Sequence, residues 1–184
     1  SVSVTWYGHS NFKVSCGDVT VFIDPFFTHN PSCPVTWNEA GKPDLVLVTH
    51  DHAIIRVRRG DLQKQRRNLR LLVGTAERPD RAGMPQASIP AGIGFNIGGT
   101  IEVKAPRHHD AGFPHFGIRA PHGYVVTMPD GFTFTIAGDT GLFSSMELIG
   151  SLYPLDLALL PVGGFFTMDG LQPPMPRVCS SPRP

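Results

Sequence analysis

The stretch Asp44-Leu45-Val46-Leu47-Val48-Thr49-His50-Asp51-His52 decides how the rest of the chain is interpreted. It begins with a continuous apolar run, which is typical of a β-strand buried on both faces. Two histidines, two residues apart, follow directly at the carboxyl end of that strand. Neutral imidazole is a common ligand for zinc and similar ions, and such a pair can point both rings at one ion. The segment therefore indicates a metal site at a strand end, although an isolated His-x-His also occurs without any metal.

The rest of the chain contains short β-rich runs separated by glycine and proline, with little helical periodicity in its first half. The runs whose apolar patterns predict strands are residues 2–7, 19–24, 45–49, 100–103, 123–128, 132–137 and 155–162. The turn Pro129-Asp130-Gly131 predicts a hairpin between two of them. A short helix is expected over 144–150, with Ser144 as its cap and Glu147 in a capping box. The pattern predicts an α/β (α+β) fold with polar residues at strand ends.

The composition narrows the possible functions. With 184 residues and 41% hydrophobic content, the chain fits one domain with a real core. Charged residues make up only 17% and the net charge is +1, so neither nucleic acid nor an anionic membrane is expected as a partner. The three cysteines are widely spaced and form no Cys-x-x-Cys, which favours a reducing, cytoplasmic setting. Neither a membrane span nor a signal peptide is expected.

Three further polar segments lie at the ends of expected strands. In Gly138-Asp139-Thr140-Gly141, Asp139 is a candidate metal ligand, or else it forms an Asx-type turn. In Pro106-Arg107-His108-His109-Asp110, two histidines follow another strand, where an ordinary surface loop is the alternative. In Tyr7-Gly8-His9-Ser10, His9 is a metal ligand, a donor of a hydrogen bond to a metal ligand, or simply a loop histidine whose hydrogen bonds are satisfied.

Taken together, these segments resemble the metallo-β-lactamase superfamily, and within it the small metal-dependent hydrolases similar to ascorbate-phosphate lactonase. The resemblance covers most of residues 2–52 and 84–170. It implies an αββα sandwich in a single domain, 1–184, in which two mixed β-sheets pack face to face with helices outside and a metal site at one edge. The segments that carry it are Trp6-Tyr7-Gly8-His9-Ser10, Ile23-Asp24-Pro25-Phe26, 44–52, Asn96-Ile97-Gly98-Gly99-Thr100, Ala137-Gly138-Asp139-Thr140-Gly141-Leu142-Phe143 and Leu159-Leu160-Pro161-Val162-Gly163-Gly164.

The resemblance also implies a set of metal ligands. His50 and His52 match two ligands of one ion, and His109 matches the third, with His108 as the alternative. Asp139 matches the carboxylate that bridges two metals. The implied metal is zinc, as one or two ions, and manganese or iron would suit the same ligands.

The implied activity is hydrolysis of a small ester, lactone or phosphorylated sugar acid. The metal lowers the pKa of a bound water towards ~7, so that hydroxide attacks, and it polarises the oxygen of the group under attack. Asp139 would orient the attacking hydroxide. His9 would line the substrate pocket.

The chain departs from the family pattern directly after His52. The family continues with any residue, then Asp, then His, whereas this chain has Ala53-Ile54-Ile55. Neither isoleucine can bind a metal. The family's last histidine, beyond the Gly-Gly turn, also has no counterpart, which suggests truncation at the C-terminus. A reasonable ligand set is therefore expected for at most one metal.

Residues 53–70 are unusually rich in arginine, and one inserted base after the His52 codon would restore Gly-Asp-His. The hypothesis is that 53–70 and 171–184 are read in a shifted frame. If the frame is as printed, the basic stretch is most simply a solvated helix. A nucleic-acid patch is disfavoured because no aromatic residues are interleaved to stack bases.

Three functional hypotheses follow. The first is a metal-dependent hydrolase that acts on a small-molecule substrate, either as a monomer or as a homo-oligomer. The second is a catalytically impaired relative that acts as a binding or structural module, in line with Ile54 and Ile55. The third is one half of an aspartic protease, because Asp139-Thr140-Gly141 is also the active-site tripeptide of that family.

Overall fold

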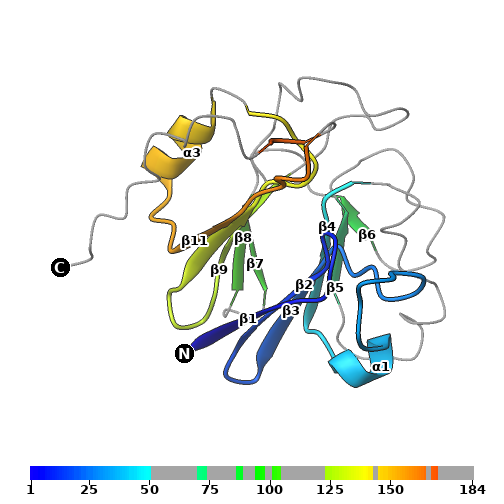
Figure 1. Ribbon diagram of the computed structural model, residues 1–184. Helices are drawn as coiled ribbons and strands as arrows, with labels where there is room; N and C mark the ends of the chain where they lie inside the picture. The colour runs from blue at the N-terminus through cyan, green and yellow to red at the C-terminus, as the bar shows by residue number, and fades with distance from the viewer. Residues whose placement is uncertain are drawn as a thin grey trace. The chain divides into compact units, whose positions relative to one another are not determined.

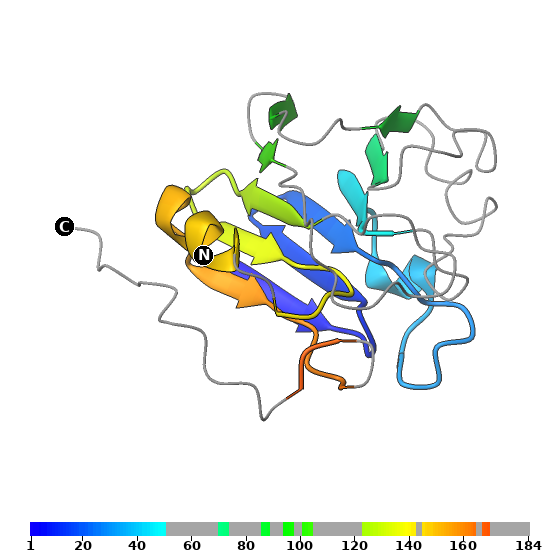
Figure 2. The ribbon, with the colours of Figure 1, turned by 90° about the horizontal axis from the view of Figure 1, so that it is seen from above.

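The computed structural model describes residues 1–50, 70–73, 86–88, 94–97, 101–104, 123–142, 145–164 and 167–169. The chain divides into two compact units, Ser1–Ile89 and Pro90–Pro184, and each unit contains one β-sheet. The strands can be followed in Figure 1 and, from above, in Figure 2. The two mixed sheets expected from the sequence are present, while the single-domain boundary stays a prediction.

The sheet of the first unit has six strands in the order β1-β2-β3-β4-β5-β6. Their bounds are Val2–Trp6, Phe12–Cys16, Val19–Ile23, Leu45–Val48, Arg70–Val73 and Gln86–Ser88. β1, β2 and β3 pair antiparallel, whereas β3, β4, β5 and β6 pair parallel. β1, β3 and β4 therefore run in the same direction, and their carboxyl ends lie at one edge of the sheet.

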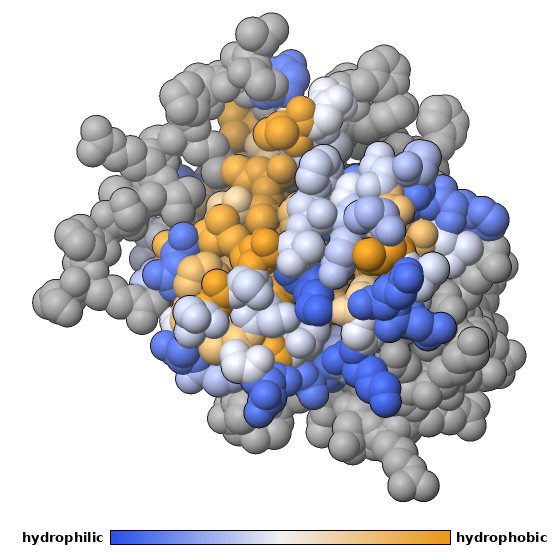
Figure 3. All heavy atoms as spheres, turned by 60° about the horizontal axis from the view of Figure 1, so that its bottom comes forward, coloured by the Kyte–Doolittle hydropathy of each residue, from blue (hydrophilic) through white to orange (hydrophobic). Residues whose placement is uncertain are grey.

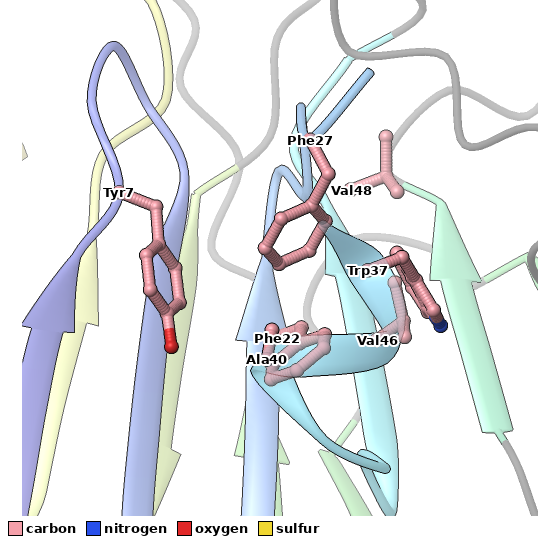
Figure 4. Packing of buried hydrophobic residues seen from close by; sticks show 7 residues of the cluster. All are labelled: Tyr7, Phe22, Phe27, Trp37, Ala40, Val46 and Val48. Carbon is pink, nitrogen blue, oxygen red and sulfur yellow. The ribbon is translucent and has the colours of Figure 1, made fainter. Parts of the chain in front are cut away.

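The core of this unit lies on β3 and β4. All four residues of β4 are buried, as the continuous apolar run predicts. The short helix α1 (Trp37–Ala40) packs on β3 through Trp37, whose ring centroid lies 5.4 Å from that of Phe22 and 5.2 Å from that of Phe27. Figure 4 shows this cluster, which also includes Tyr7, Ala40, Val46 and Val48. Burial of these rings anchors the loop between β3 and β4 against the sheet.

The sheet of the second unit has the order β11-β10-β9-β8-β7. The strands are β7 (Gly94–Ile97), β8 (Ile101–Lys104), β9 (Tyr124–Thr127), β10 (Thr133–Ile136) and β11 (Leu157–Leu159), and α3 spans Ser145–Leu152. β10 and β11 pair parallel, and the other pairs are antiparallel. The predicted hairpin joins β9 to β10, where Gly131 adopts a φ of +85° and its N–H donates to Met128 O at 2.9 Å.

The expected strands and helix are confirmed, with ends shifted by up to three residues, while Ser144, the expected cap of the helix, lies outside the described residues. The sequence reading missed β2, β5, β6, β7 and α1. Apolar side chains also reach the surface (Figure 3); on the edge strand β1, Val4 and Trp6 are 41% and 63% exposed. Within the described residues, no helix has both the length and the apolar character needed to cross a membrane.

Candidate active site

Polar side chains gather at the carboxyl edge of the first sheet. The β1–β2 loop carries His9, the segment after β3 begins with Asp24, and β4 is followed by Thr49 and His50. This placement follows from the common direction of β1, β3 and β4. Ligands and catalytic groups commonly collect at such strand ends, where a rigid sheet fixes their positions.

Asp24, Thr49 and His50 form a buried hydrogen-bonded series. Asp24 Oδ1 accepts from the Thr49 N–H at 2.7 Å, and Asp24 Oδ2 accepts from the Thr49 hydroxyl at 2.8 Å. Thr49 Oγ1 in turn lies 2.8 Å from His50 Nδ1. All three residues are fully buried, and Asp24 has a φ of +42°, a conformation that is costly for a non-glycine residue.

The direction of these hydrogen bonds defines the tautomer of His50. An ionised carboxylate can only accept, so the Thr49 hydroxyl gives its proton to Asp24. The same oxygen then accepts from Nδ1–H of His50, which places the imidazole lone pair on Nε2. Metal-binding histidines are usually held in this way, with the second ring nitrogen donating to a polar neighbour. The surroundings of His50 therefore fit a metal ligand that binds through Nε2.

His9 is exposed but held in a defined position. Trp6 Nε1 donates to the His9 carbonyl oxygen at 2.7 Å, and His9 Nδ1 lies 3.0 Å from Ser10 Oγ. The His9 ring meets Phe26 edge to face, with centroids 5.9 Å apart. His9 also has a φ of +54°. Such backbone strain persists only where neighbouring contacts enforce it, and it is common at functional sites.

The loop that carries His9 is joined to the loop after β3. Asn30 Nδ2 donates to the carbonyl oxygens of Tyr7 and Gly8, each at 3.3 Å, and of Phe26 at 3.0 Å. Gly8 has a φ of +90°, and a Cβ placed there would lie 2.6 Å from Ser32 Cβ. Burial, followed by the effect of the Cys33 thiol, raises the pKa of the Tyr7 hydroxyl above its ordinary value of 10.0, so Tyr7 stays protonated at neutral pH.

In the second unit, Asp139 follows β10 as the sequence predicts. The preceding Gly138 adopts a φ of +68°, and Asp139 itself is half-buried. The following residue, Thr140, is buried, and its carbonyl oxygen accepts from Met168 N at 3.2 Å. The Asp139 carboxylate is thus presented from a glycine-flanked turn whose backbone is tied to the segment around Met168.

The structure describes part of the predicted ligand set. His9, His50 and Asp139 lie at strand ends as expected, whereas His52, His108 and His109 lie outside the described residues, as does Ala53-Ile54-Ile55. Within the described ranges no three His, Cys, Asp or Glu residues form a metal-binding group. Asp24 and Thr49 had no predicted role. The signal was present, because Asp24 ends a β-rich run directly before Pro25, much as His50 directly follows the next run.

Known proteins are similar to this chain in both sequence and fold. The family model described as Beta-lactamase superfamily domain matches residues 3–173. A protein of Nitratidesulfovibrio vulgaris strain Hildenborough, named UPF0173 metal-dependent hydrolase, is 52% identical over 176 residues, which cover 92% of this chain and 72% of that protein. A Lawsonia intracellularis protein of the same name is 47% identical, covering 94% and 76%. The solved structure of a metallo hydrolase from Ignicoccus hospitalis KIN4/I is 27% identical with a TM-score of 0.72, covering 91% of this chain and 73% of that one.

Proposed function

This chain belongs to the metallo-β-lactamase superfamily and is a metal-dependent hydrolase, and on that premise we propose that it cleaves a small ester, lactone or phosphorylated sugar acid with the help of zinc. The proposal rests above all on the Asp24–Thr49–His50 series. A buried imidazole whose Nδ1 proton is committed to a hydroxyl has its lone pair on Nε2, as a metal ligand requires.

We propose His50, His52, His109 and Asp139 as the residues that hold the metal, with His108 as the alternative to His109. Imidazole and carboxylate ligands suit zinc, and they also accommodate manganese or iron. When bound, the ion would supply Lewis-acid chemistry, activating water and polarising the substrate oxygen. Asp139 would accept a hydrogen bond from the attacking water and so orient it.

His9 is proposed to bind the substrate. Its ring is exposed at the edge that also carries His50, and Ser10 and Phe26 hold it in place. A ring fixed before the substrate arrives loses less conformational entropy on binding than a mobile one. We further propose a cytoplasmic location, since Cys16 and Cys33 are both free thiols. The expected absence of nucleic-acid and membrane partners stays a prediction.

A chelator experiment tests the proposed function. The chain is treated with a strong chelator, dialysed, and assayed against a panel of small esters, lactones and sugar phosphates before and after adding zinc, manganese or iron. We expect chelation to abolish hydrolysis and zinc to restore it most fully. Hydrolysis that persists without metal would contradict the proposal.

A catalytically impaired binding module is the second candidate, and Ala53-Ile54-Ile55 is the observation that favours it. This candidate predicts that zinc binds but no member of the substrate panel is turned over at any metal concentration. Turnover that follows zinc occupancy would exclude it. The same titration therefore separates the two candidates.

A further inference from the structure

Asn11, which follows the His9 loop, is fully buried with an unsatisfied side chain. Among the residues that the structure describes, none forms a hydrogen bond with its Nδ2 or Oδ1 atom. Buried amides are nearly always paired, because an unpaired one loses its hydration without compensation. The exception therefore needs an explanation, such as a ligand that binds in the functional state.

The backbone of Asn11 is already fixed without its side chain. Tyr7 N donates to Asn11 O at 2.9 Å, and Asn11 N donates to Gly8 O at 3.1 Å. These bonds close the β1–β2 loop, and the φ of Asn11 is not in the left-handed region that favours Asn in turns. The carboxamide is therefore not required for the local fold.

The register of the sheet places Asn11 beside the metal-ligand network. Phe12 and Ile23 form the last pair of the antiparallel β2–β3 ladder, so the flanking residues Asn11 and Asp24 both lie just beyond that end of the ladder. Asp24 accepts two hydrogen bonds from Thr49, which contacts His50. Asn11 thus lies at the same edge of the sheet as His9 and the Asp24–Thr49–His50 series.

Asn30 at the same edge makes a useful contrast. Its Nδ2 donates to three carbonyl oxygens and its Oδ1 accepts from Ser32 N at 3.0 Å, so its amide is fully used in holding the loops together. Two buried asparagines in one region thus have opposite hydrogen-bonding states. Asn30 has a structural role, and Asn11 has polar atoms that the fold does not use.

We propose that the Asn11 carboxamide binds the substrate, an inference that rests on the hydrolase function proposed above. The carboxamide is uncharged and offers one donor beside one acceptor, and the neighbouring Asp24 carboxylate disfavours an anion. The complementary ligand is an uncharged group with an acceptor beside a donor, such as a hydroxy ester or a hydroxy lactone. Asn11 is in this view a specificity-determining residue that reads a hydroxyl next to the scissile carbonyl.

Melting temperatures of the metal-free protein give the first test. Asn11→Leu replaces the amide by an apolar side chain of similar size, and we expect the melting temperature to rise by about 2–4 °C because an unpaired polar group is removed. Asn30→Leu is the matched control and should lower it. Asn11→Ala tests whether a change seen with leucine comes from the packing of the larger apolar side chain or from the loss of the amide. A fall in both Asn11 variants, as in Asn30→Leu, would overturn the proposal.

Ligand probes give the second test. Glycolamide, which carries a hydroxyl beside an uncharged carbonyl, should raise the melting temperature of the wild type but not of Asn11→Leu. In turnover, the wild type should have a higher kcat/KM for methyl glycolate than for methyl acetate. In Asn11→Leu, the ratio of these two kcat/KM values should be about tenfold lower. Equal stabilisation of both proteins by glycolamide would overturn the proposal. If the wild type cleaves neither these esters nor any other member of the substrate panel, the proposed hydrolysis fails, while the glycolamide shift and the melting temperatures still decide the role of Asn11.

Discussion

Among single residues, Thr49 links the buried carboxylate of Asp24 to the ring of His50. Thr49→Val keeps the shape of this side chain and removes the oxygen that accepts the Nδ1 proton. We expect the affinity for zinc to fall about 10–100-fold, because the ring is no longer held in one tautomer and one orientation. Competition with a chromophoric chelator measures this affinity, and circular dichroism checks that the fold is kept.

Asp44→Asn provides the matched control for this prediction. Asp44 Oδ2 also accepts a backbone hydrogen bond, from Thr20 N at 2.8 Å, but at the amino-terminal ends of β3 and β4, the opposite edge from His50. We expect its zinc affinity to equal that of the wild type. Wild-type affinity in Thr49→Val would mean that the hydroxyl has no part in positioning His50.

Among the elements, the β1–β2 loop depends on a close approach at Gly8. Both Gly8 and Gly17 have positive φ, but only Gly8 lies where a Cβ would collide with Ser32. Gly17→Ala should cost about 1–2 kcal/mol for the left-handed conformation alone. Gly8→Ala should cost more, roughly 2–5 kcal/mol, because steric strain is added. Urea unfolding measures both, and equal losses would contradict the close approach.

The sequence predicted those elements whose pattern is purely local. β4 and the hairpin between β9 and β10 are examples, since a continuous apolar run and a Pro-Asp-Gly turn each specify one structure. β2 was missed although Phe12-Lys13-Val14-Ser15-Cys16 alternates apolar and polar residues, because five residues make a short pattern; its pairing on both sides with β1 and β3 fixes it as a strand. α1 was missed because four residues are too few to show helical periodicity; its formation depends on burial of Trp37.

The candidate site was predictable to a similar extent. His50 and Asp139 were predicted as candidates because ligand-type residues directly after apolar strands form a recognisable pattern. The position of Asp24 at the end of a β-rich run was visible in the sequence, but its hydrogen bonds with Thr49 were not, since they join segments 25 residues apart. Only the register of the sheet brings those segments together.

For the whole molecule, the departure from the family pattern at Ile54 and Ile55 limits the expected metal content. The double substitution Ile54→Asp with Ile55→His would restore the side chains that the family pattern carries after His52. We expect the bound zinc to rise from about one ion per chain towards about two, with higher turnover, because carboxylate and imidazole are zinc ligands and isoleucine is not. Elemental analysis and the ester assay measure the two effects.

The control for this change is Ile54→Ser with Ile55→Ser, which adds polarity without good zinc ligands. It should leave the metal content unaltered. A rise in both double variants would point to improved solubility instead of a second site. No rise in either would mean that residues elsewhere limit the site to one ion.

The most direct test of the account is the metal content of the purified wild-type chain, compared with His50→Ala. Protein prepared without added metal or an affinity tag is analysed for zinc, manganese and iron per chain. The account predicts that the wild type retains zinc and that His50→Ala loses it, because His50 is the proposed ligand whose ring is held by Thr49 and Asp24. A wild type without bound metal, or a His50→Ala variant with the same content, would contradict it.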